Sequence, residues 1–61
     1  MINTLSKEVI EKLETCIQNN IDKDKELIID QMQIILMAYK LTFMAWTIVE
    51  DLYNTLYKNN Q

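Results

Sequence analysis

Residues 24–58 read DKELIIDQMQIILMAYKLTFMAWTIVEDLYNTLYK, a run without Gly or Pro. Gly and Pro are the residues that most readily interrupt a helix, and the whole chain contains neither. Apolar residues recur along this run at alternating steps of four and three, the spacing of a coiled coil. The pattern predicts one continuous helix over residues 24–58, roughly 52 Å long at about 1.5 Å per residue.

Upstream of this run, residues 6–19 have the pattern of an ordinary amphipathic helix. Ser6 is a good N-cap, because its hydroxyl can accept a hydrogen bond from an unpaired backbone N–H of the first turn. The apolar residues then fall on one face: Val9, Leu13, Cys16 and Ile17. Asn19 and Asn20 tolerate the backbone conformations that end helices, so we expect a turn at about residues 20–23.

The two expected helices differ in length, and this difference predicts association. The first helix would reach only about 21 Å, so in a hairpin it covers the second helix up to about Tyr39. The remaining half is rich in apolar and aromatic residues that a monomer would leave in water. The predicted fold is therefore all-α: a helical hairpin with a short first and a long second helix, paired as a homodimeric four-helix bundle in one domain, residues 1–61. The residues expected at the interface with the second subunit or another partner are Ile35, Tyr39, Thr42, Phe43, Trp46, Val49, Tyr53, Leu56 and Tyr57.

A second apolar row lies about 140° around the same helix, if each residue turns about 100°. Its members are Ile34, Met37, Leu41, Met44 and Ile48. One apolar row needs one neighbouring helix, whereas two rows this far apart need two. The long helix is therefore expected to lie between the first helix and another subunit.

Two other architectures fit parts of the pattern. A bend near residues 40–42 would give a monomeric three-helix bundle. The sequence there contains no Gly, Pro or Asn, the residues that would favour such a bend. The run from Ile34 to Val49 could cross a membrane, but it is shorter than the roughly 20 residues that a bilayer requires. Lys40 in its centre would also be costly to insert.

Composition excludes most catalytic chemistry. The chain has no His and only one Cys, so it lacks a Cys/His zinc site and the usual nucleophile and base pairs. Glu50 and Asp51 are adjacent, and consecutive residues on a helix point in different directions. We expect no catalytic residue, no cofactor and no metal site, with Cys16 as a buried apolar side chain.

Charge and terminal residues point to a cytoplasmic protein that does not bind nucleic acid. The net charge is −3, and all six basic residues are Lys, scattered among acidic ones. Nucleic-acid-binding proteins normally present a basic face that includes Arg. No apolar segment of the secretory type follows Met1, so a cytoplasmic location is expected.

The remaining class of function is binding. We expect a small, non-enzymatic homodimer that binds and modulates a larger protein, such as a host transcription regulator, as regulators from phages and mobile elements do. The AT-rich coding implied by frequent Ile, Asn and Lys is compatible with a phage source. Two alternatives stay open: a small membrane-associated protein of the holin-like or stress type, and an RNA-binding hairpin dimer, which rests on similar size and shape alone.

Overall fold

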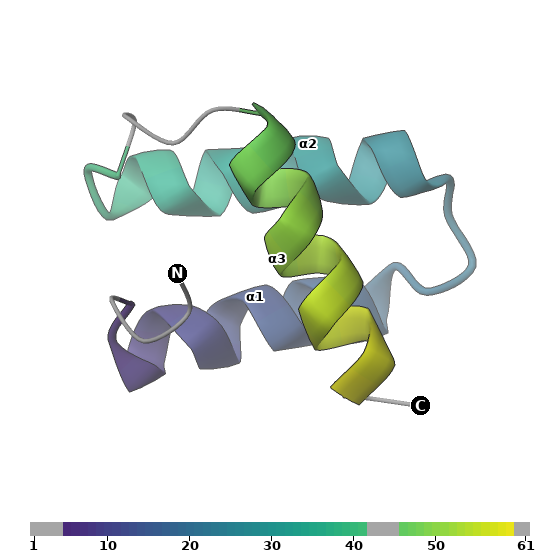
Figure 1. The fold of residues 1–61 in the computed structure, drawn as a ribbon, viewed down its shortest axis with the longest axis horizontal. Helices are drawn as coiled ribbons and strands as arrows, with labels where there is room; N and C mark the ends of the chain where they lie inside the picture. The colour runs from purple at the N-terminus through teal and green to yellow at the C-terminus, as the bar shows by residue number, and fades with distance from the viewer. Residues whose placement is uncertain (1–4, 42–45, 60–61) are drawn as a thin grey trace.

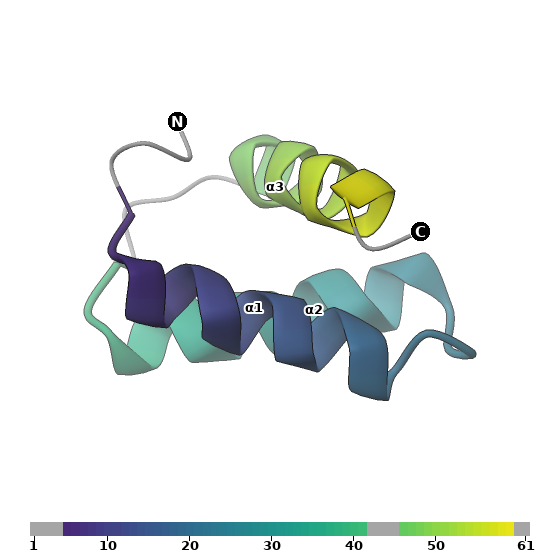
Figure 2. The same ribbon diagram turned by 90° about the horizontal axis from the view of Figure 1, so that it is seen from below.

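The computed structural model describes residues 5–41 and 46–59, which form three helices of similar length and, within those ranges, no strand. Helix α1 spans Lys7–Asn19, α2 spans Lys25–Ala38 and α3 spans Trp46–Asn59. The helices α1 and α2 lie side by side and run in opposite directions (Figure 1). Helix α3 lies across both of them, as a second layer over the α1–α2 pair (Figure 2). The all-α prediction is confirmed.

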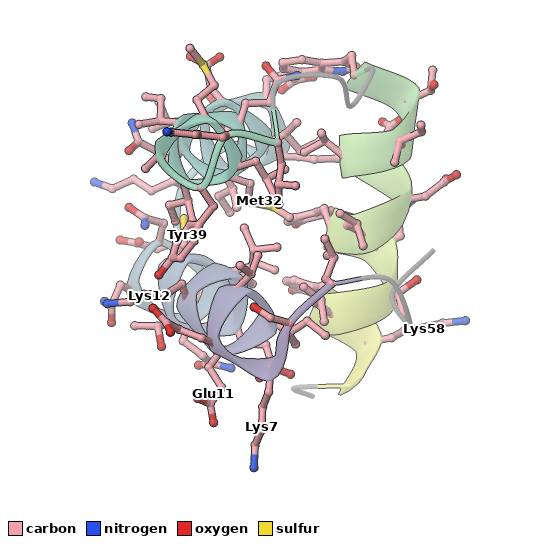
Figure 3. All side chains as sticks on the ribbon, turned by 90° about the vertical axis from the view of Figure 1, so that its left-hand side faces the viewer. Lys7, Glu11, Lys12, Met32, Tyr39 and Lys58 are labelled. Carbon is pink, nitrogen blue, oxygen red and sulfur yellow. The ribbon has the colours of Figure 1, made fainter. Side chains whose placement is uncertain are left out.

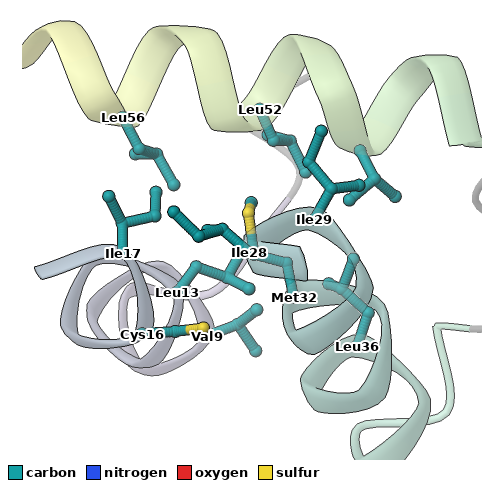
Figure 4. Close-up of a cluster of buried hydrophobic side chains, with 11 residues drawn as sticks. Val9, Leu13, Cys16, Ile17, Ile28, Ile29, Met32, Leu36, Leu52 and Leu56 are labelled. Carbon is teal, nitrogen blue, oxygen red and sulfur yellow. The ribbon is translucent and has the colours of Figure 1, made fainter. Parts of the chain in front are cut away.

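All three helices contribute to one hydrophobic core. Its buried members are Val9, Leu13, Cys16, Ile17, Ile28, Ile29, Met32, Leu36, Val49, Leu52 and Leu56. Leu52 and Leu56 point from α3 toward the other two helices, with Leu56 facing Ile17 of α1 (Figure 4). Met32 points from α2 into the space between the helices (Figure 3). The core therefore closes within a single chain.

The helix α1 begins and ends as its sequence predicts. The Ser6 hydroxyl accepts a hydrogen bond from the Val9 amide at 3.2 Å, so Ser6 is the N-cap. At the other end Asn20 is the C-cap, and its side-chain amide donates to the Cys16 carbonyl at 2.8 Å. Asp24 stands at the N-cap of α2 in an extended conformation, without a side-chain capping bond.

The prediction of one continuous helix over residues 24–58 is wrong. Helix α2 ends at Ala38, and Lys40 has a φ angle of 62°, in the left-handed region. The Leu41 amide donates to the Leu36 carbonyl at 2.8 Å, and the Lys40 amide donates to the Met37 carbonyl at 2.9 Å. These two bonds form a Schellman motif, the standard C-terminal stop of a helix, here with Lys at the position that Gly usually occupies.

Burial of α3 explains why the chain turns without Gly or Pro. Turning back allows Val49, Leu52 and Leu56 to pack inside the same chain. Burying three such side chains contributes roughly 5–9 kcal/mol, at about 1.5–3 kcal/mol each. A left-handed conformation at a residue with a Cβ atom costs only about 1–2 kcal/mol. The tertiary contacts therefore outweigh the local preference for a straight helix.

The turn also removes the difference in helix length from which the dimer was predicted. The molecule measures 27 × 19 × 18 Å along its principal axes, about half the length expected for the long helix. Helix α3 supplies the cover that the sequence argument sought from a second subunit. Association with a second subunit or another protein would use the surface that this fold leaves exposed.

Candidate interaction surface

One face of α2 remains apolar and exposed after the three helices have packed. We call this the α2 outer face and define it as Leu27, Ile34, Met37 and Ala38. The exposed fractions of the three large side chains are 44% for Leu27, 56% for Ile34 and 59% for Met37. Ala38 is also exposed. Met37 and Ile34 are the two most exposed large apolar side chains among the described residues.

Helical geometry explains why these residues share a face. At about 100° per residue, Leu27, Ile34 and Ala38 lie within about 40° of one another around the helix, and Met37 lies beside them. The buried residues of α2 lie on the opposite side, toward α1 and α3. Figure 3, a view along α2, shows its side chains extending both into the core and away from it. A helix that is apolar on both sides is typical of one that packs against more than one neighbour.

The outer faces of the other two helices are polar. On α1 the exposed residues are Lys7, Glu8, Glu11, Lys12, Thr15, Gln18 and Asn19. On α3 they are Thr47, Asp51, Asn54, Thr55 and Lys58, preceded by Trp46 at the start of the helix. Among the described helices, an apolar row along the outside is thus a property of α2.

Charged residues lie on the α2 outer face and on either side of it. Asp24, Glu26 and Asp30 lie at or near the beginning of α2, and all three are exposed. From residue 31 to residue 39 the sequence has no charged residue, and Lys40 follows directly. At about 100° per residue, Asp30 lies on the same side of α2 as Ile34 and Met37, and Lys40 lies beyond the end of the helix at Ala38.

Lys25, at the beginning of α2, forms an ion pair with Glu50 of α3. Its ammonium nitrogen lies 2.9 Å from a carboxylate oxygen of Glu50 and 5.9 Å from the centre of the Tyr53 ring. The hydrogen bond with Glu50 raises the pKa of Lys25, and the negative charge of Glu50 acts in the same direction. Lys25 therefore links α2 to α3.

Tyr39 fixes the other end of α2 against α1. Its hydroxyl donates a hydrogen bond of 2.7 Å to a carboxylate oxygen of Glu8. This bond favours the protonated hydroxyl and raises the pKa of Tyr39. Contacts at both ends of α2 thus hold the helix, and with it the outer face, in a defined orientation.

The structure distributes the nine residues expected at an interface among different environments. Val49 and Leu56 are buried in the core. Ile35, Tyr39, Tyr53 and Tyr57 are partly buried and pack against it, and the rings of Tyr53 and Tyr57 lie 5.5 Å apart. Trp46 is 41% exposed. Thr42 and Phe43 lie outside the described residues. That these residues contact another chain stays a prediction, and in this fold α1 and α2 already cover Val49 and Leu56.

The α2 outer face corresponds in part to the second apolar row of the sequence. Ile34 and Met37 belong to that row and are exposed, whereas Leu41 and Ile48 are partly buried, and Met44 lies outside the described residues. Leu27 was missed. Its position seven residues before Ile34 was the available signal, since residues seven apart return to the same side of a helix.

The described residues offer little else that could bind a ligand or react. Cys16 is a free, buried cysteine, and burial raises the pKa of its thiol, which favours the neutral form. No three acidic or Cys side chains among the described residues lie close enough to hold a metal ion. None of the described helices has the length and apolar character needed to span a membrane.

Comparison with known protein families, with curated protein sequences and with solved structures gives no significant match to this chain.

Proposed function

We propose that this chain is a small, non-enzymatic interaction protein that acts by binding another protein through the α2 outer face. The observation that carries the proposal is the exposure of Leu27, Ile34 and Met37 in a row on one helix. Scattered exposed apolar residues are normal on any protein, whereas several large ones gathered on one side of a helix indicate a binding surface.

The size of the chain supports the same conclusion. A protein of 61 residues has few apolar side chains to spare, and its core uses eleven described ones. Three further large apolar residues lie on the outside, where their burial is only partial and stabilises the isolated fold less than full burial would. Their exposure has a physical role if a partner covers them, because burying these side chains then stabilises the complex.

The partner that we propose is a larger regulatory protein in the cytoplasm, with a host transcription regulator as the leading example. This part of the proposal rests on elimination. The chain has no Arg and its net charge is −3, so direct nucleic-acid binding is disfavoured and regulation would proceed through protein contacts.

Affinity capture with matched variants tests this function. The tagged chain, its Ile34→Glu variant and its Thr15→Glu variant are each used to capture proteins from a bacterial lysate. Ile34→Glu places a charge in the middle of the α2 outer face, and Thr15→Glu places the same charge on the polar outside of α1. Circular dichroism establishes that both variants remain helical.

The proposal predicts a partner that the unmodified chain and Thr15→Glu capture and Ile34→Glu does not. With that partner purified, the affinity for Ile34→Glu should be at least about tenfold weaker, as for a central interface residue. If Ile34→Glu captures the same partner with unchanged affinity, binding does not use the α2 outer face and the proposed function is wrong.

A further inference from the structure

We propose that the partner of the α2 outer face is a different protein with an apolar groove that places a basic side chain, Arg or Lys, opposite Asp30. This inference rests on the proposed function, because it gives the chemistry of the partner at the same surface. It adds Asp30 as a residue that selects the partner, and it excludes a second copy of this chain as the occupant.

Asp30 lies within the exposed apolar row of α2. Residues three and four positions apart are neighbours on the surface of a helix. Asp30 follows Leu27 by three positions and precedes Ile34 by four, and it lies within about 40° of Ile34 around the helix. All three side chains are exposed. A surface that covers Leu27 and Ile34 therefore also covers Asp30.

The chain itself does not neutralise the charge of Asp30. Among the described residues, Asp30 forms no ion pair. The basic residue of α2 is Lys25, which pairs with Glu50 of α3 and lies about 140° around the helix from Asp30. Covering a carboxylate without giving it a cation or hydrogen-bond donors is unfavourable. A partner that covers the apolar row therefore has to supply a basic group.

A second copy of this chain does not supply that group. The residues on the exposed side of α2 are Leu27, Asp30, Gln31, Ile34, Met37 and Ala38, and none of them is basic. If two copies met through this side in either orientation, each Asp30 would lie against apolar side chains, Gln31 or the other Asp30. Two carboxylates would lose their hydration without gaining a cation. The charge of the face thus opposes self-association and favours a partner of complementary charge.

The shape of the face favours a groove over a flat surface. The face is a ridge formed by one helix of 14 residues, about 21 Å long, and α1 and α3 pack on the opposite side. Its large side chains recur after seven and three residues, a spacing typical of helices that bind in apolar grooves. Against a flat surface, such a ridge buries less than the standard interface of about 800 Å² per partner. A groove contacts both flanks of α2 and so reaches Asp30 beside the apolar row.

Sedimentation equilibrium of the purified chain tests the exclusion of a second copy. We expect a monomer at concentrations up to about 1 mM, where even a weak dimer would be detected. A dimer that Ile34→Glu abolishes and Thr15→Glu retains would place a second copy on the α2 outer face, and it would overturn the inference.

The charge is tested with the purified partner that the unmodified chain and Thr15→Glu capture and Ile34→Glu does not. Asp30→Asn keeps the size of the side chain and removes its charge. We expect this change to weaken the affinity for that partner by about tenfold to a hundredfold, as when one member of a covered ion pair is removed. Added salt should weaken binding of the unmodified chain more than binding of Asp30→Asn, because salt screens the attraction between the opposite charges.

Glu11→Gln is the matched control for Asp30→Asn. It removes the same charge from an exposed position on the outside of α1, and it should change the affinity by less than about twofold. Circular dichroism establishes that both variants keep their helices. Binding by Asp30→Asn that is as tight as binding by the unmodified chain, or tighter, would show that no basic group of the partner faces Asp30 and would overturn the inference.

The proposed function and this inference fail in different ways. If Ile34→Glu binds the partner as well as the unmodified chain does, both are wrong, because binding does not use the α2 outer face. If Ile34→Glu weakens binding and Asp30→Asn does not, the proposed function stands and the basic group opposite Asp30 is refuted. Capture of no protein by the unmodified chain contradicts both.

Discussion

At the scale of single residues, Leu52 and Trp46 distinguish this fold from a long helix with an aromatic interface. Leu52 is 1% exposed in the core, whereas Trp46 is 41% exposed at the beginning of α3. We predict that Leu52→Ala lowers the free energy of unfolding by about 2–5 kcal/mol, as in large-to-small changes in cores. Trp46→Ala should lower it by only about 1–2 kcal/mol, because less of the side chain is buried.

Urea denaturation of both variants, followed by circular dichroism in dilute solution, measures this difference. A long second helix with Trp46 in its interface and Leu52 outside it would give the opposite order. A larger loss for Trp46→Ala than for Leu52→Ala would therefore contradict the packing of α3 described above.

The hydrogen bond between Tyr39 and Glu8 should make the stability of the fold depend on pH. The hydrogen bond raises the pKa of Tyr39 in the folded chain, so its stabilising effect is present below the ordinary tyrosine pKa of about 10 and disappears as the pH rises through the higher folded value. Ultraviolet absorbance of the phenolate, compared between the unmodified chain and Tyr39→Phe, isolates this titration from Tyr53 and Tyr57.

Glu8→Gln provides the control for this titration. It removes the carboxylate that accepts the hydrogen bond, so the pKa of Tyr39 should fall back toward about 10. If the titration of Tyr39 is the same with Gln at this position, the hydrogen bond to Glu8 does not persist in solution.

At the scale of elements, the end of α2 at Ala38 can be tested with Lys40→Gly. This change should have opposite effects on stability in the three-helix fold and in a continuous helix. Lys40 has a φ angle of 62°, which costs a residue with a Cβ atom about 1–2 kcal/mol. Lys40→Gly removes that cost. Because Gly loses more conformational entropy on folding, the change also has an opposing cost of about 0.5–1 kcal/mol. We predict a net stabilisation of roughly 0.5–1 kcal/mol, measured by urea denaturation.

Lys40→Gln is the matched control, since it removes the charge and keeps the Cβ atom. Its effect on stability should stay within about 0.5 kcal/mol. Within a continuous helix, Lys40→Gly would instead destabilise the chain by about 1 kcal/mol. A loss of stability on introducing Gly would therefore show that α2 continues through residue 40.

Local chemistry allowed the prediction of α1 but not of the break after α2. The cap of α1 uses Ser6, and its end uses Asn20, and both residues have side chains suited to these positions. The end of α2 uses Lys40, which has no such preference. The cause of that turn is the burial of α3 residues more than eight positions further along, and a local pattern contains no information about such distant contacts.

At the scale of the whole molecule, the same turn explains which part of the candidate site was predictable. The second apolar row already indicated that Ile34 and Met37 need a neighbour other than the first helix, and both are exposed in the fold. The aromatic half was expected at an interface because a long helix would leave it uncovered. Once α3 folds back, Val49 and Leu56 become core residues, and the row of exposed apolar residues among the described helices lies on α2.

Helix α3 folds back onto α2 within one chain, and the proximity of Lys25 and Tyr53 gives a direct test of this arrangement. The Lys25 ammonium lies 5.9 Å from the centre of the Tyr53 ring. In a continuous helix these residues would be about 42 Å apart. The measurement is a nuclear Overhauser effect between the two side chains, recorded on labelled chain diluted in an excess of unlabelled chain. The fold predicts that the signal persists on dilution, because it arises within one chain. Loss of the signal on dilution, or its absence together with unbroken helical chemical shifts across residues 24–58, would contradict the fold.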